Sequence, residues 1–140
     1  KSRRNKMKLE FFLHGRPIPK QSARIGKFGG YQPKRIKNYA EKVRVYCLQA
    51  LSNGRWKVSE RPVCVEMTFC FPWPGNTKKA LKETRNWRIK RPDLDNLSKA
   101  ILDGMDTLWL DDAQVSHLDV RKMNVPKGEE GVEIVVSYVE

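Results

Sequence analysis

The sequence contains few of the residues that zinc sites and thiol or imidazole catalysis require. Its 140 residues include 3 cysteines and 2 histidines, and no two cysteines have the C-x-x-C spacing that helps to assemble a zinc tetrahedron. The cysteines are therefore expected to be buried or incidental thiols. No arrangement of histidine, cysteine and serine offers a catalytic nucleophile. These shortages argue against a zinc enzyme and against covalent catalysis.

Long hydrophobic runs are also absent. No segment approaches the roughly 18 consecutive apolar residues of a membrane span. The opening stretch KSRRNKMKLEFFLHG is basic at its start but lacks a small-residue cleavage site, so no leader peptide is expected. Hydrophobic residues make up 39% of the chain and charged residues 31%, as in globular proteins of the cytoplasm, and the length fits one domain.

Aspartate is missing from the first 92 residues, where the chain is strongly basic. Residues 1–92 contain 24 Lys and Arg against 5 Glu, a net charge of +19, whereas residues 93–140 contain 4 against 11, a net charge of −7. Residues 16–37 and 78–91 are two basic segments with seven Lys or Arg each. Such segments are typical of surfaces that contact nucleic-acid phosphates, because each neutralised phosphate releases condensed counterions. The alternative is a solvated face that only keeps the protein soluble.

Hydrophobic periodicity predicts an α+β domain. Alternating apolar residues predict strands, and apolar residues at helical spacing predict helices. The predicted strands are residues 7–14, 63–71, 115–123 and 131–139, and the predicted helices are residues 34–53 and 93–108. Residues 1–6 are expected to form a basic flexible tail, residues 15–33 a long loop, and residues 76–90 a loop or short helix. This order predicts a single domain over residues 7–140, in which two main helices pack on a small mixed β-sheet.

Six of the seven aspartates lie in the stretch RPDLDNLSKAILDGMDTLWLDDAQ. Asp93 and Asp95 come where an extended chain enters a helix, so both carboxylates can approach one point. Asp111 and Asp112 precede a strand, where adjacent side chains point to opposite faces, so one of them is expected to join the first pair. Carboxylates about 4 Å apart repel by roughly 4 kcal/mol at an effective dielectric constant of 20. Mg²⁺, which prefers oxygen ligands, would offset that repulsion.

The same spacing is equally consistent with a structural role. Asp93 could cap the helix, Asp95 and Asp103 could each pair with Lys99 one turn away, and the Asp-Asp pair could form a turn. In the catalytic alternative, Lys99 places its ammonium group beside the metal and stabilises negative charge on a phosphate. The spacing alone does not decide between the two.

The stretch RPDLDNLSKAILDGMDTLWLDDAQV resembles the pattern of the RusA-type Holliday junction resolvases, which are crossover junction endodeoxyribonucleases. In that family an R-x-D-L-D-N-L-x-K-A run opens a helix, and a D-D-[AS]-Q-[VI] run follows. The segment from Phe11 to Lys20 is similar to the family's opening strand and basic loop. The resemblance covers most of the chain, from about residue 9 to about residue 136.

The resemblance implies a Mg²⁺-dependent endonuclease that hydrolyses paired phosphodiester bonds of four-way DNA junctions in recombination and repair, with Mn²⁺ as a substitute ion. It implies that Asp93, Asp95 and Asp112 are metal-binding catalytic carboxylates and that Lys99 is the essential lysine. A homodimer is implied as well, because two strands must be cut symmetrically. The expected location is the cytoplasm, at the nucleoid, with a bacterial or phage origin and no membrane partner.

Six basic residues are candidates for DNA contacts: Lys20, Arg24, Lys27, Arg88, Lys90 and Arg91. After Lys20 the chain continues Gln-Ser-Ala, where many relatives carry arginines at once, so individual contact roles in this loop do not transfer directly. Two alternatives to a resolvase stay open. One is a metal-dependent nuclease acting on flaps or other branched DNA, and the other is a non-catalytic DNA-binding module with structural aspartates.

Overall fold

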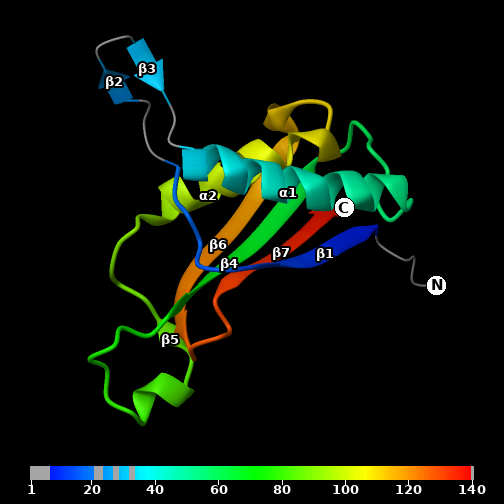
Figure 1. The fold of residues 1–140 in the computed structure, drawn as a ribbon. Helices are drawn as coiled ribbons and strands as arrows, with labels where there is room; N and C mark the ends of the chain where they lie inside the picture. Colours follow the sequence, from blue (N-terminus) through cyan, green and yellow to red (C-terminus); the bar gives the residue numbers. More distant parts are fainter. Residues whose placement is uncertain (1–6, 21–23, 27–28, 32–33, 140) are drawn as a thin grey trace, which may run out of the picture.

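A five-stranded mixed sheet forms the centre of the molecule. The structure is a computed structural model, and it describes residues 7–20, 24–26, 29–31 and 34–139. The sheet has the order β1-β7-β4-β6-β5, and its strands are β1 (Lys8–His14), β4 (Val63–Pro72), β5 (Asn86–Trp87), β6 (Val115–Val125) and β7 (Gly131–Tyr138). The helices α1 (Lys34–Ser52) and α2 (Leu94–Gly104) lie on the same side of this sheet (Figure 1). The α+β class and the two main helices predicted from the sequence are confirmed.

Two crossover connections place the helices. Strands β4 and β6 are parallel, so the chain between them must return along the sheet, and α2 lies in this return. Strands β1 and β4 are each antiparallel to β7, so they run in the same direction, and α1 connects them. The last strand, β7, fills the position between β1 and β4.

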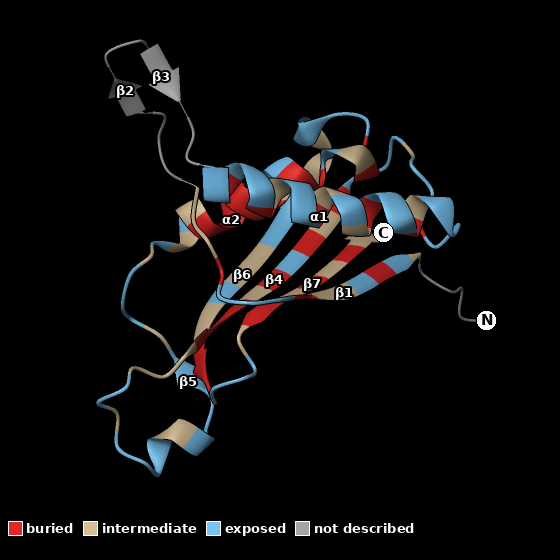
Figure 2. Cartoon of the chain, viewed as in Figure 1, coloured by how far each residue is buried: buried red, intermediate tan, exposed pale blue. Residues whose placement is uncertain are grey.

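The hydrophobic core lies between the helices and the sheet (Figure 2). Alternate residues of β4 are fully buried, as the period of two predicts: Val63, Val65, Met67, Phe69 and Phe71. They meet the buried stripes of the helices, which include Tyr39, Val43 and Cys47 of α1 and Leu97 and Ile101 of α2. Trp56 closes one end of the core, where its Nε1 donates to the Leu108 carbonyl at 2.8 Å. Among the described residues, no helix has both the length and the apolar character needed to cross a membrane.

Three sequence-based expectations are corrected. The long loop 15–33 contains two short antiparallel strands, β2 (Arg24–Gly26) and β3 (Gly29–Tyr31), whose three-residue, glycine-rich sequences have no readable alternation. The second helix ends at Gly104 rather than 108, because Met105 leaves helical geometry and a 3₁₀ turn, η2 (Asp106–Leu108), follows. In segment 76–90 the 3₁₀ turn η1 (Leu81–Glu83) is followed by strand β5. The predicted tail, residues 1–6, lies outside the described residues.

Gly104 allows α1 and α2 to approach each other closely. A Cβ atom at this position would lie 2.7 Å from Val43 Cβ and 2.8 Å from the Ala40 carbonyl oxygen. Neither atom is the far end of a flexible side chain, so rotation of a side chain cannot relieve the close contact. The contact therefore fixes α2 against α1 and, with it, the aspartates at the start of α2.

We expect Gly104→Ala to lower the free energy of unfolding by about 1–3 kcal/mol, because the added methyl group overpacks the helix contact. Gly75→Ala is the matched control, since no atom lies within 4 Å of the added Cβ there. This control should change stability by less than about 0.5 kcal/mol. Urea unfolding of the three proteins measures both values, and equal stabilities would contradict the close contact.

Candidate active site

Asp93 and Asp95 lie at the start of α2. Asp93 occupies the N-cap position in an extended conformation, but its side chain makes no capping hydrogen bond. Asp95 lies in the first turn and accepts a hydrogen bond from the Asn96 amide at 2.9 Å. Both residues are exposed, and the positive end of the helix dipole favours carboxylates there. The suggestion that the Asp93 side chain caps α2 is therefore wrong.

The Asp-Asp pair separates into two roles. The Asp111 side chain accepts a hydrogen bond from the Ala113 amide at 2.8 Å and forms a capping box with Gln114 for the 3₁₀ turn η3 (Asp112–Gln114). Gln114 also donates to the Ser59 carbonyl at 2.8 Å, which ties this turn to the loop before β4. Asp111 is thus structural, and its D-x-x-Q spacing was the feature of the sequence that could have shown it.

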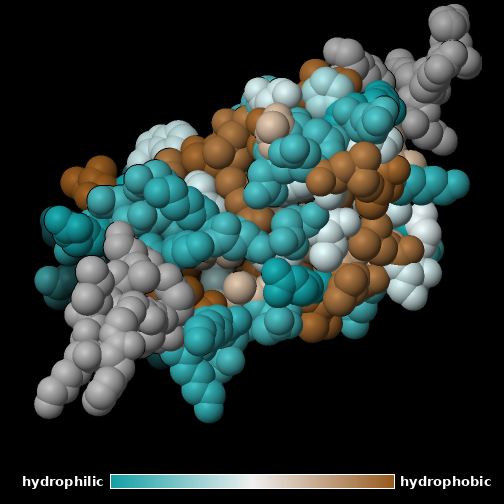
Figure 3. Space-filling model, turned by 90° about the horizontal axis from the view of Figure 1, so that it is seen from above, coloured by the Kyte–Doolittle hydropathy of each residue, from teal (hydrophilic) through white to brown (hydrophobic). Residues whose placement is uncertain are grey.

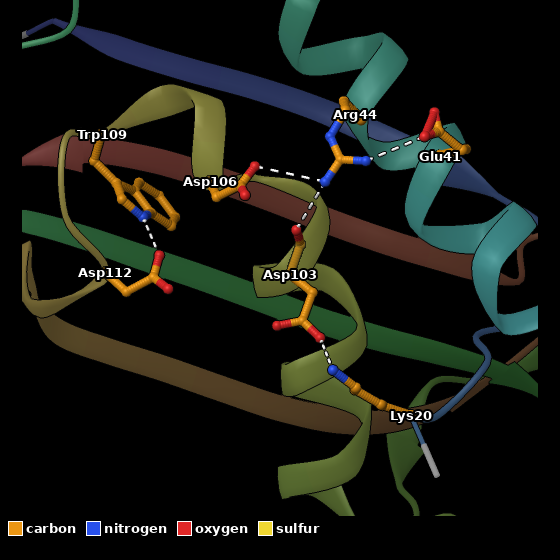
Figure 4. Close-up of polar contacts among 7 residues, drawn as sticks. All are labelled: Lys20, Glu41, Arg44, Asp103, Asp106, Trp109 and Asp112. Atoms are coloured by element: carbon orange, nitrogen blue, oxygen red, sulfur yellow. Dashed lines mark hydrogen bonds and ion pairs between the residues drawn. The ribbon is translucent and has the colours of Figure 1, made fainter. Parts of the chain in front are cut away.

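Asp112 and Lys99 line the same pocket. The pocket has a volume of about 200 Å³ and lies between α2 and the start of β6, and its lining residues are Lys99, Leu102, Asp103, Trp109, Asp112 and Val115. The indole Nε1 of Trp109 donates to Asp112 Oδ1 at 2.9 Å (Figure 4). Because Trp109 is buried, this hydrogen bond sets the orientation of the Asp112 carboxylate.

The other aspartates of the cluster are used in ion pairs. Asp103 pairs with Lys20, and Asp106 lies 3.6 Å from the Arg44 guanidinium of α1 (Figure 4). Outside the cluster, Asp119 pairs with its neighbour Arg121 at 2.9 Å. The first two contacts hold the loop after β1 and helix α1 to the end of α2 and the 3₁₀ turn that follows it. None of these pairs involves the three aspartates named by the family pattern.

Lys99 and those three aspartates form no ion pair with any residue that the structure describes. The structural alternative, in which Lys99 pairs with Asp95 or Asp103 one turn away, is therefore not found. The Lys99 side chain is exposed and lines the pocket that holds Asp112. Its ammonium group can therefore donate to an anionic ligand in that pocket.

The three predicted ligands are not gathered at one point. Within the described ranges, no three His, Cys, Asp or Glu side chains lie close enough to hold a metal ion. Asp112 lines the pocket together with Lys99 of α2. Asp93 and Asp95 precede Lys99 by one to two helical turns and do not line the pocket. The chemistry of the donor set fits a hard cation, since all three residues are exposed carboxylates that have no ion pair to a described residue.

Lys122 is a residue of the site that the sequence analysis missed. Its Nζ donates to the Lys90 and Pro92 carbonyls at 2.8 Å each, which fastens the chain just before Asp93 to strand β6. Burial and the nearby Arg88 lower the pKa of Lys122, while Asp93 opposes that shift. The signal in the sequence was the position of Lys122 two residues after Val120, on the strand face that the helices cover.

The structure locates four of the six candidate DNA contacts. Arg88 is half-buried, with its guanidinium 4.2 Å from the Phe71 ring centroid and a 2.7 Å hydrogen bond to the Arg91 carbonyl. Lys90 and Arg91 are exposed, and Lys20 is held by Asp103. Arg24 begins β2, where only the backbone is described, and Lys27 lies outside the described residues. Their roles in DNA binding stay predictions.

Comparison with known proteins gives two matches. Residues 14–137 match the family described as Endodeoxyribonuclease RusA. The chain is also 30% identical over 135 residues to the crossover junction endodeoxyribonuclease rusA of Lactococcus phage r1t. The aligned region covers 92% of this chain and 97% of the phage protein. The match extends from the end of β1 to β7 and includes every carboxylate discussed above. It confirms the resemblance found in the sequence and the class of enzyme, a DNA phosphodiester hydrolase: the chain belongs to the RusA family of crossover junction endodeoxyribonucleases.

Proposed function

We propose that this chain resolves four-way DNA junctions by Mg²⁺-dependent hydrolysis of paired phosphodiester bonds. One observation carries the proposal. Four of the seven aspartates have a structural partner, in an ion pair or a capping box, and the remaining three are Asp93, Asp95 and Asp112. A fold that leaves these three carboxylates without an ion pair to any described residue, in a protein of net charge +12, is consistent with their use as ligands.

Asp93, Asp95 and Asp112 would hold the ion, with Mn²⁺ as a possible substitute. When bound, Mg²⁺ would act as a Lewis acid on the scissile phosphate and would lower the pKa of a coordinated water. The hydrogen bond from Trp109 to Oδ1 fixes the orientation of the Asp112 side chain. The second carboxylate oxygen, Oδ2, therefore also has a defined direction. Lys99 donates to the phosphate oxygens and stabilises the charge that develops on them in the transition state.

A homodimer follows from the substrate. A four-way junction is cut symmetrically on two strands, and a C₂ dimer supplies two identical sites in the required relation. The surface seen from above carries apolar side chains among hydrophilic ones (Figure 3). Helix α1 exposes Val45 and Leu48, to 50% and 48% respectively. These two residues are candidates for the contact between copies.

The experiment that tests the function is cleavage of an end-labelled four-way junction in Mg²⁺, beside a flap and a linear duplex of the same sequence. We expect paired nicks in the junction alone, and none in EDTA. Asp95→Asn and Asp112→Asn should each slow cleavage at least about 100-fold and keep junction binding, because they remove a ligand and not a phosphate contact. Asp119→Asn is the control, since Asp119 pairs with Arg121 outside the site, and it should cut normally.

Each contrary result has a distinct meaning. Equal cutting of the flap would replace the resolvase by a nuclease for branched DNA in general. Cutting by Asp112→Asn at the normal rate would return the aspartates to a structural role. Tight junction binding by the wild-type protein without any cut would leave a DNA-binding module.

The hydrogen bond from Trp109 to Asp112 gives a second prediction. Trp109→Phe keeps an aromatic ring in the core but removes the donor, so the Mg²⁺ concentration for half-maximal cleavage should rise by about 10–100-fold. Excess Mg²⁺ should restore the rate. Trp73→Phe is the matched control, because it removes an indole hydrogen bond of 2.8 Å to the Thr84 carbonyl, outside the lining of the site. Equal Mg²⁺ dependence of the two variants would show that Trp109 does not orient Asp112.

A further inference from the structure

A second pocket, rich in arginine, lies beside the chain segment that leads into Asp93. It has a volume of about 460 Å³ and is formed by the loop after β1, the first turn of α1 and the residues just before α2. Three arginines line it, Arg16, Arg35 and Arg91, together with the apolar residues Ile18, Phe71 and Pro92. A neighbouring pocket of about 360 Å³ shares Arg16 and Arg35 and adds Lys42. No Asp or Glu occurs among the described residues that line either pocket.

The charges of these arginines are not neutralised within the described chain. Arg16, Arg35 and Arg91 form no ion pair with a described residue. The charge of Arg16 helps to lower the pKa of Glu130. Backbone hydrogen bonds are the main cause of that shift, however, and Arg16 contributes least. The first turn of α1 also contains no acidic residue, so the positive end of its dipole adds to the same potential.

The position of Arg16 is set by stacking. Its guanidinium lies 5.2 Å from the Phe71 ring centroid, and Arg88 lies 4.2 Å from the same ring. Phe71 is fully buried, so it presents no open face on which a nucleotide base could stack. Burial, and then the charge of Arg16, lower the pKa of Arg88, as expected where two guanidinium groups are held close together. This arrangement favours a compact anion and not a base.

We propose that Arg16, Arg35 and Arg91 form a seat for one backbone phosphate of the DNA strand, next to the phosphate that is cut. The proposal rests on the proposed function and adds a contact to it. Guanidinium groups match phosphate oxygens through paired hydrogen bonds, and three of them around one pocket with no acid select a phosphate. Arg91 and Pro92 line the pocket and Asp93 follows directly, so the seat adjoins the candidate active site.

The wall of the seat is held by specific contacts. Arg88 donates to the Arg91 carbonyl at 2.7 Å, and Lys122 donates to the carbonyls on either side of it, those of Lys90 and Pro92. These bonds fix the distance between the seat and Asp93. A phosphate bound in the seat therefore positions the strand relative to the carboxylates.

The test neutralises one DNA phosphate at a time. Methylphosphonates are placed singly along the strand that is cut, and binding of the four-way junction to the wild-type protein is measured in EDTA, where no cleavage occurs. We expect one position near the scissile phosphate, and distinct from it, at which the neutral group weakens binding on the order of tenfold. In Arg16→Gln/Arg35→Gln, the same methylphosphonate should have less than about a twofold effect, because its protein partners are gone.

A matched control separates a local contact from the general attraction of charge. Arg16→Gln and Arg35→Gln should each reduce the slope of log affinity against log salt by about 1. Arg55→Gln removes the same charge from an exposed residue after α1 that lines neither pocket, and it should keep the sensitivity to the methylphosphonate.

Two results would overturn the seat while the proposed function stands. One is a wild-type protein that cuts junctions but shows no sensitive phosphate besides the scissile one. The other is a double variant that keeps the sensitivity. The scan reads binding alone, so a protein that shows the sensitive phosphate but never cuts a junction would support the seat and overturn the proposed function.

Discussion

The parallel pairing of β4 with β6 is the constraint on which the site depends. Parallel neighbours cannot be joined by a tight turn, so the chain between them has to leave the sheet and return over one face. That return contains the second basic segment, helix α2 and the turn η3, and therefore Asp93, Asp95, Lys99 and Asp112. A single topological requirement thus brings the basic residues and the carboxylates into one crossover, beside the edge of β6.

The contacts of α2 convert this crossover into a fixed arrangement. Gly104 brings the end of the helix against Val43 of α1, and Lys122 fastens the residues before its start to β6. The helix is therefore held at both ends by different physical means, close packing at one and side-chain hydrogen bonds to backbone carbonyls at the other. A carboxylate at its first turn then has a defined position relative to the sheet, although its own side chain is exposed.

Periodicity in the sequence predicted the parts of the molecule that are long and regular. Helix α1 was expected at residues 34–53 and extends over Lys34–Ser52, because Ile36, Tyr39 and Val43 repeat at helical spacing. The end of α2 was misplaced because Leu108 continues the apolar spacing although the chain leaves the helix at Met105. The carboxylates were identified from two short runs that resemble a known family, whereas spacing alone left a helix cap or an ion pair equally possible.

The arginine seat was not predicted for a different reason. Arg16, Arg35 and Arg91 are far apart in the sequence, and they meet only because the loop after β1, the start of α1 and the segment just before α2 lie side by side. Charge counting identified both basic segments, but it cannot distinguish Arg88, which is stacked and hydrogen-bonded within the protein, from Arg91, which faces the pocket. That distinction is a property of packing.

The arrangement of the carboxylates is itself favourable for a protein that must fold before it binds an ion. Repulsion between two unit charges falls in inverse proportion to their separation, so carboxylates at different points along α2 and η3 cost less than three at about 4 Å. Asp95 and Asp112 each accept one hydrogen bond, from Asn96 and from Trp109, which directs the side chain without cancelling its charge. Among the residues that the structure describes, the aspartates that form ion pairs are Asp103, Asp106 and Asp119. The fold therefore uses Asp103, Asp106 and Asp119 in ion pairs and leaves the aspartates proposed to bind Mg²⁺ without an ion pair to a described residue, close to the proposed arginine seat.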